Sequence, residues 1–215
     1  PVSSETFVID QISGLMERGV DVQILAMTKG NMEIANDNLI RHKMLQKACY
    51  LTDENKAQTA PVTLLQRIKN IASAWPTLSL IKSLNFLKYK RHSLSLLLPS
   101  ICAKSASRFG DDKAVIIAHF GPAGVIANKL IQVGLLKGKL ATVFHGADIS
   151  QHDILAQFAT EYVELFSQGK KMLPISELWK QRLIDMHCPE QKITLNRMGI
   201  DIKRFDYSPS FYSSE

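Results

Sequence analysis

Two histidines each follow an apolar stretch and stand within two residues of a glycine. The segment "AVIIAHFG" places His119 beside Gly121, and "ATVFHGADIS" places His145 beside Gly146. An imidazole donates or accepts a hydrogen bond and changes its charge near neutral pH, so it can bind a hydroxyl or exchange a proton with one. Glycine allows a ligand to approach the backbone closely. The two segments therefore predict a ligand site, and a buried structural histidine is the open alternative for each.

Asp148 lies three residues after His145 and offers a carboxylate to the same site. Such a group accepts a hydrogen bond from a substrate hydroxyl, or it caps the helix that follows. Both roles are open for Asp148. A metal site formed by His145, Asp148 and His152 is not expected, because "HGADISQH" contains no helical HxxxH pair.

Motifs of the commonest cofactor sites are absent from the sequence. It contains no GxGxxG, no GxxxxGKS or GxxxxGKT, and no GxSxG, so dinucleotide-binding, P-loop and serine-hydrolase sites lose their main support. Cys49, Cys102 and Cys188 lie far apart, which argues against a disulfide framework or a zinc site. The net charge of +6 favours an anionic partner. Nucleic acid is not expected, because no aromatic–basic motif accompanies that charge.

Alternating strands and helices must position these residues. Apolar alternation and short apolar runs predict strands, whereas apolar spacing of three to four residues predicts helices. The predicted strands are 20–27, 114–118, 139–146, 170–176 and 191–199, and the predicted helices are about 3–19, 123–133, 153–169 and 176–187. This alternation is typical of an α/β, Rossmann-like fold, in which a parallel sheet carries helices on both faces.

Three turns are expected at one edge of this sheet, because the carboxyl ends of parallel strands meet there. They are "HFGPAG" after the strand at 114–118, "HGAD" after the next strand, and "SSET" before the first helix (Ser3, Ser4, Glu5 and Thr6). Backbone N–H groups at the beginning of each helix favour anions or sugar hydroxyls. We predict a crevice at this edge, with both histidines on its wall.

Residues 30–110 interrupt the alternation. This segment is rich in Leu, Lys, Ser and Asn and shows no convincing strand, so we predict a helical insertion. Within it, residues 81–100 place Lys and Arg beside Leu and Phe, which suits an interfacial helix on anionic lipid. The alternative is an ordinary helix with a solvated basic face. No apolar run reaches the roughly 18 residues that span a bilayer.

Four segments, in this order along the chain, resemble one family: "PVSSETFVIDQISGLMERGVDVQI", "AHFGPAGVIA", "FHGADIS" and "LPISELWKQRLIDMHCPEQKITLNRMGIDIKRF". They are similar to the N-terminal half of GT-B retaining glycosyltransferases of the GT4 family (group 1), bacterial enzymes of exopolysaccharide, colanic-acid-like and lipopolysaccharide assembly. The resemblance covers 1–27 and about 113–206. It implies that 1–206 form the acceptor-side Rossmann-like domain with its first strand missing, that 207–215 begin an interdomain linker, and that the donor domain is absent.

The resemblance also implies roles for individual residues. His145 faces the transferred sugar as a catalytic residue, and Asp148 lies near it. The loop Ser3–Thr6 approaches the donor phosphates or the acceptor. The remaining expected substrate contacts are His119, Gly121, Gly146, Ser176 of "PIS" and Arg197 of "RMGID".

The implied reaction transfers a hexose from a nucleotide-diphosphate sugar to a lipid-linked, polysaccharide or lipopolysaccharide acceptor at the cytoplasmic face of the membrane. The nucleotide sugar is a substrate, and neither a cofactor nor a metal is expected. Retention in this family is assisted by the leaving phosphate and needs no protein nucleophile. The family's E-x7-E pair is absent here, so we expect this piece alone to be inactive. The alternatives are a sugar-nucleotide epimerase-like relative and a non-catalytic ligand-binding α/β domain.

Overall fold

A three-stranded parallel sheet forms the centre of the protein. The computed structural model describes residues 6–28, 43–53, 59–105 and 109–199. Its larger sheet contains β3 (Val115–His119), β4 (Lys139–Phe144) and β5 (Lys171–Pro174), in the order β3-β4-β5. All three lie near the predicted positions, and the predicted Rossmann-like α/β architecture is confirmed. The register pairs His119 with Val143, so β3 and β4 end side by side.

A second parallel sheet pairs β1 (Ile24–Ala26) with β2 (Ala48–Tyr50). The prediction of no strand within 30–110 was therefore wrong at β2. Three residues are too few to show an alternating pattern, and pairing with β1 decides their conformation. The expectation of a missing first strand stays a prediction.

The strand predicted at 191–199 was also wrong. A short 3-10 helix, η2 (Glu190–Lys192), precedes a single bridge between Ile193 and Met172. The N–H groups of Thr194 and Asn196 donate to carbonyls of β5, each at 2.9 Å. This segment follows β5 without forming a strand of its own.

Four helices around the sheet begin and end close to their predicted positions: α1 (Thr6–Glu17), α9 (Gly121–Val133), α11 (His152–Gln168) and α12 (Glu177–Asp185). The four-residue α10 (Ala147–Ser150) was not predicted. Pro122 starts α9, where its missing N–H costs nothing. Gly134 ends it in the left-handed conformation, with φ 84°.

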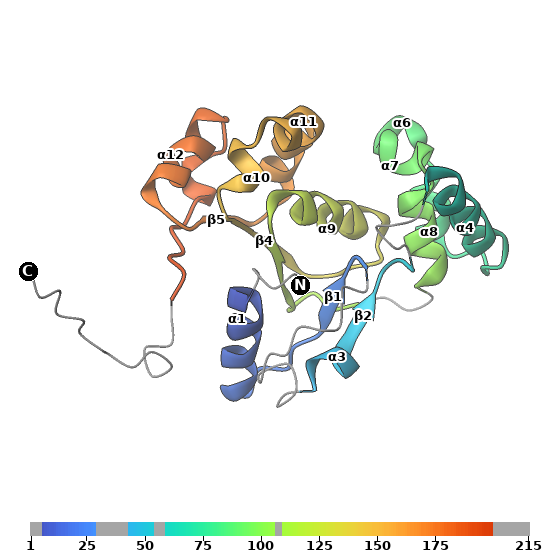
Figure 1. Ribbon diagram of the computed structural model, residues 1–215, viewed down its shortest axis with the longest axis horizontal. Coiled ribbons are helices and arrows are strands. Elements are labelled where there is room, and N and C mark those ends of the chain that lie inside the picture. The colour runs from blue at the N-terminus through green and yellow to red at the C-terminus, as the bar shows by residue number, and fades with distance from the viewer. Residues whose placement is uncertain (1–5, 29–42, 54–58, 106–108, 200–215) are drawn as a thin grey trace, which may run out of the picture.

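Most of residues 59–105 is helical, as predicted, and we call this part the helical lobe. It contains α4 (Ala60–Ala72), α5 (Leu78–Ser83), α6 (Phe86–Tyr89), α7 (Arg91–Leu94) and α8 (Leu97–Lys104); the four-residue α3 (Met44–Lys47) precedes β2. The single interfacial helix predicted at 81–100 was wrong, because Lys90 (φ 46°) and Leu96 (φ 57°) interrupt the helical backbone. Figure 1 shows the lobe at one end of the molecule and α10–α12 at the other.

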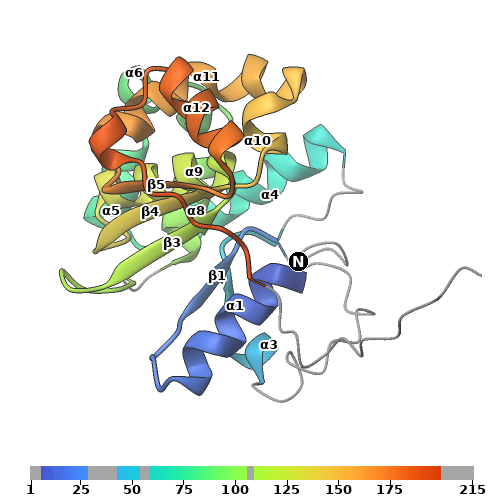
Figure 2. The same cartoon turned by 90° about the vertical axis from the view of Figure 1, so that its left-hand side faces the viewer.

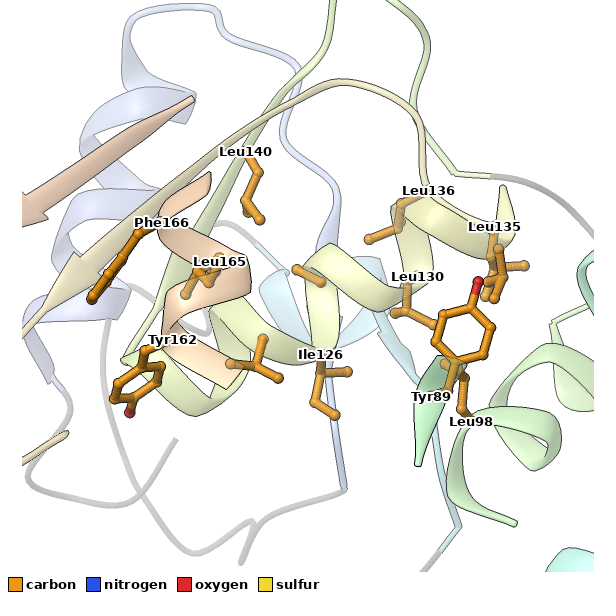
Figure 3. Close-up of a cluster of buried hydrophobic side chains, with 14 of the residues drawn as sticks. Tyr89, Leu98, Ile126, Leu130, Leu135, Leu136, Leu140, Tyr162, Leu165 and Phe166 are labelled. Atoms are coloured by element: carbon orange, nitrogen blue, oxygen red, sulfur yellow. The ribbon is translucent and has the colours of Figure 1, made fainter. Parts of the chain in front are cut away.

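The lobe and the sheet share one hydrophobic core. Figure 3 shows Tyr89 and Leu98 of the lobe beside Leu130 of α9, while Leu165 and Phe166 of α11 pack at the other end of the cluster. Burying each such side chain fully contributes about 1.5–3 kcal/mol to the free energy of folding. The lobe is therefore fixed to α9, and Figure 2 shows α1 on the opposite side of the sheet from α9 and α11. Among the described residues, no helix is long and apolar enough to cross a membrane.

Candidate functional site

His119 and His145 come together at the carboxyl edge of the sheet. His119 is the last residue of β3 and His145 follows β4, so the parallel register brings them side by side. The distance from His119 Nδ1 to His145 Nε2 is 3.2 Å. Their rings are stacked, with centroids 5.4 Å apart and planes inclined by 25°. The prediction that these two turns meet at one edge is confirmed.

Two phenylalanines enclose the His145 ring. Phe7 of α1 lies 4.6 Å from it and Phe120 lies 4.5 Å from it, measured between ring centroids. Phe7 thus brings the beginning of α1 to the same edge, next to the exposed Thr6. Ser3, Ser4 and Glu5 lie outside the described residues. Neither aromatic residue was predicted from the sequence, although each is a direct neighbour of a predicted site residue.

Phe120 has an unusual backbone conformation, with φ 72° and ψ 142°. A bulky residue at positive φ is an outlier that costs on the order of 1–3 kcal/mol. Its N–H donates to the carbonyl of Val143 at 2.9 Å, which holds it in place. Such strain is typical of functional sites, and here it presses the ring of Phe120 against His145.

His145 is neutral at neutral pH. Burial, and to a lesser extent the charge of the neighbouring His119, lower the pKa of His145 to about 4. A neutral imidazole carries one N–H, so one ring nitrogen donates and the other accepts. Nε2 faces His119, whereas Nδ1 is buried and has no hydrogen-bond partner in the described part of the chain. Nδ1 is thus an unsatisfied polar atom in the interior of the site, which is energetically costly.

Asp148 connects the two turns that carry the histidines. Its side chain is 1% exposed. Oδ1 accepts the N–H groups of His145 (3.0 Å) and Gly146 (2.9 Å), and Oδ2 accepts the N–H of Gly121 at 2.8 Å. Burial raises the pKa of the Asp148 carboxyl, and these N–H donors act in the opposite direction. In this geometry Asp148 positions the site, and the predicted contact with substrate stays a prediction.

The two glycines are required by packing of the protein itself. Gly146 has φ 100°, and a Cβ there would lie 2.5 Å from the indole of Trp179. A Cβ on Gly121 would lie 2.4 Å from the hydroxyl of Tyr162, which donates to the backbone carbonyl of Asp148 at 2.9 Å. Side chains of the protein thus pack against both glycines, and the predicted contact of Gly121 and Gly146 with substrate stays a prediction.

Ser176 and Arg197 lie at the beginning of α12. The Ser176 hydroxyl accepts the N–H of Trp179 at 3.3 Å and caps the helix. Arg197 is exposed, and its Nη2 lies 3.9 Å from Glu177 Oε1. Trp179, whose N–H is bound by Ser176, packs its indole against Gly146. The contacts of Ser176 and Arg197 in the structure are thus with α12, and their predicted role with substrate stays a prediction.

A groove of about 720 Å³ opens beside His119 and Phe120. The residues that line it come from both the sheet edge and the lobe: Met27, Arg91, His92, Ser95, Leu97, His119, Phe120, Pro122, Ala123, Ile126 and Phe158. Most of these side chains are apolar, with a few polar groups that can orient a ligand, as is usual for binding pockets.

Glu161 holds two basic residues on the wall of this groove. Arg91 Nη2 lies 2.5 Å from Glu161 Oε2, and His92 Nε2 lies 2.7 Å from Oε1. The Arg91 guanidinium also stacks over the Phe158 ring at 4.4 Å. Burial raises the pKa of Glu161, but the hydrogen bonds and charges of His92 and Arg91 outweigh it and lower the pKa to about 2. The wall facing His119 is therefore held in one conformation.

Within the described segments, no three His, Cys, Asp or Glu side chains form a cluster that could hold a metal ion. The carboxylate of Asp148 is occupied by backbone N–H groups. The side chain of His152 is 97% exposed and lies 3.9 Å from Asp153.

The chain is similar to curated proteins that are named as glycosyltransferases. The chain is 42% identical over 212 residues to the "Putative colanic acid biosynthesis glycosyltransferase WcaL" of Salmonella typhimurium, which covers 96% of this chain and 50% of that protein. It is 40% identical over 207 residues to the "Amylovoran biosynthesis glycosyltransferase AmsK" of Erwinia amylovora, again covering 96% of this chain and 50% of the relative.

The WcaL protein of Escherichia coli K12 is 40% identical over 213 residues, with 97% of this chain and 50% of that protein covered. No family model and no solved structure matches the chain. The chain spans about half the length of the curated relatives it matches, and over that half it is homologous to bacterial glycosyltransferases of exopolysaccharide biosynthesis.

Proposed function

We propose that the intact protein transfers a hexose from a nucleotide-diphosphate sugar to a glycan or lipid-linked acceptor, with retention of the anomeric configuration. The observation that carries the proposal is the stacked pair of His119 and neutral His145 at the carboxyl edge of the sheet, where His119 lines a groove large enough for a sugar. Relatives named as glycosyltransferases support the reaction class.

In the proposed reaction, an oxygen of the acceptor attacks the anomeric carbon while the bond between that carbon and the diphosphate breaks. The hydroxyl proton leaves with the diphosphate. In this proposal His145 contacts the transferred sugar as a neutral side chain and does not act as a general acid, because a pKa of about 4 leaves it unprotonated at neutral pH. Such a contact accelerates transfer to the extent that it strengthens in the transition state.

Asp148 fits this reaction as a positioning residue. Three backbone N–H groups occupy its two oxygens, so it is poorly placed to attack a sugar. This agrees with retention that needs no protein nucleophile. We further propose that the acceptor occupies the groove between His119 and the lobe, where Phe158 and other apolar side chains can pack against a sugar face.

Turnover of the intact protein tests the role of His145. The assay incubates a panel of radiolabelled nucleotide-diphosphate hexoses with lipid extract as acceptor and counts label transferred to the lipid. His145→Ala is expected to reduce kcat by about 100-fold or more, the effect of losing one transition-state hydrogen bond. The matched control is His152→Ala, because His152 follows the same turn but is exposed. Its turnover should equal that of the parent. Near-normal turnover of a folded His145→Ala variant would remove the assigned role.

A further inference from the structure

The basic charge of this protein is concentrated in the helical lobe. Residues 60–104 contain seven Lys or Arg and no Asp or Glu, which leaves 19 basic and 20 acidic residues for the rest of the chain. The acid-free stretch extends from 55 to 110. The lobe therefore carries a formal charge of +7 and the rest of the chain −1, which together give the net charge of +6.

Four lysines of the lobe project from its surface. Lys69, Lys82, Lys88 and Lys90 are exposed, and none of them forms an ion pair with another described residue. By contrast, Arg91 is paired with Glu161, and Lys104 is paired with Asp53. The four lysines are therefore available to an anionic partner.

Large apolar side chains of the same lobe are also exposed. Trp75 is 85% exposed and Leu87 is 80% exposed, and no residue of α4 is buried. The other exposed apolar side chains of the lobe are Val62, Leu64, Leu65, Ile68, Leu78, Ile81, Leu84, Phe86 and Leu94. Of the large apolar side chains exposed in the described residues, most belong to this lobe, and a partner is expected to cover such surface.

We propose that the helical lobe binds an anionic lipid surface, with Trp75 and Leu87 inserted among the headgroups and the lysines on the lipid phosphates. Lysines interleaved with Trp, Phe and Leu are the composition of surfaces that lie in a membrane interface. A second copy of the chain is a poorer partner, because two lobes without a single acid would repel each other.

The location of the lobe connects this surface to the candidate site. Arg91, His92 and Ser95 of the lobe form one wall of the groove beside His119. Docking of the lobe therefore places the groove close to the bilayer, within reach of an acceptor whose lipid stays in the membrane. This consequence rests on the proposed function, whereas lipid binding itself does not.

Vesicle flotation of the intact protein, without donor or acceptor, tests the proposal independently of transfer. The vesicles contain phosphatidylcholine, with or without phosphatidylglycerol. Each lysine near an anionic surface contributes about fivefold to binding, so Lys82→Gln, Lys88→Gln and Lys90→Gln together should weaken partitioning by about 100-fold. The matched control changes three exposed lysines of the sheet region, Lys113, Lys139 and Lys170, to Gln. This control should bind the anionic vesicles nearly as well as the parent.

Fluorescence tests the insertion of Trp75, one of two tryptophans in the chain. Anionic vesicles should shift the emission to shorter wavelength, and Trp75→Phe should abolish the shift while flotation changes less. Equal recovery on both vesicle types, or unweakened binding of the folded triple variant, would overturn the proposal. Concentration-dependent dimerisation that protects Trp75 without lipid would also overturn it and would assign the surface to a second copy.

Discussion

Replacement of Asp148 provides the most direct test of how the site is held. Asp148→Asn keeps the size of the side chain but exchanges one acceptor oxygen for an NH2 group. The amide oxygen can still accept the N–H groups of His145 and Gly146, whereas the NH2 group faces the N–H of Gly121. Asp148→Ala removes all three hydrogen bonds and leaves three N–H groups without their acceptor.

The expected loss of stability follows from these contacts. A buried donor without a partner costs about 1–3 kcal/mol, so Asp148→Asn should lower the free energy of unfolding by about 2 kcal/mol. Asp148→Ala should lower it by about 4 kcal/mol, since its effects are not fully additive. For a chain of this length, 1 kcal/mol corresponds to roughly 2–4 °C in Tm. We expect Tm to fall by about 4–8 °C for Asn and by about 8–16 °C for Ala.

Thermal unfolding followed by circular dichroism measures both variants. The matched control is Asp153→Asn, which changes a fully exposed carboxylate five residues away and should leave Tm unchanged. The interpretation would be refuted if Asp148→Ala melted within about 1 °C of the parent, given the 2–4 °C expected per kcal/mol. It would also be refuted if Asn were more damaging than Ala.

Two further predictions concern packing and acid stability. Gly146→Ala should lower the free energy of unfolding by about 3 kcal/mol or more, because the new Cβ combines a positive φ with a clash against Trp179. Gly134→Ala, at φ 84° with open space around its Cβ, should cost only about 1–2 kcal/mol; equal Tm values for the two would contradict the clash. Glu161 has its pKa lowered from 4.5 to about 2, so the stability it contributes is present above pH 4.5 and is lost as the pH falls towards 2. Glu161→Gln should be less stable than the parent at neutral pH, and this difference should shrink over that window; a constant difference would show that Glu161 is not responsible.

The sequence predicted correctly the strands and helices that have long, regular patterns of apolar residues. Strands at 114–118, 139–146 and 170–176 and the helices between them alternate clearly, so their order predicted a parallel sheet. Because parallel strands end at one edge, the meeting of His119 and His145 followed from their positions alone. Short or irregular elements gave no such pattern, and β2 and the break at Lys90 could not be predicted.

The chemistry of the site depended on contacts between residues far apart in the sequence. The sequence offered two roles for Asp148, a helix cap or a contact with substrate, and did not indicate that its second oxygen accepts the N–H of Gly121. The sequence suggested a ligand as the reason for Gly146, whereas the structure shows Trp179 packed against it. Neither partner is recognisable from local sequence, because each contact joins different elements of the fold.

The sequence by itself therefore determined the parallel α/β core, the two histidines at its edge and the acid-free basic segment. Only the tertiary structure decided that His145 is neutral, that Asp148 joins two turns, and that the basic segment forms a broken lobe with exposed Trp75. Periodic patterns specify elements because each residue's face is set by its neighbours along the chain. The charge state and exposure of a side chain depend on the residues that pack against it. Those residues come from distant parts of the sequence, so only the tertiary structure identifies them.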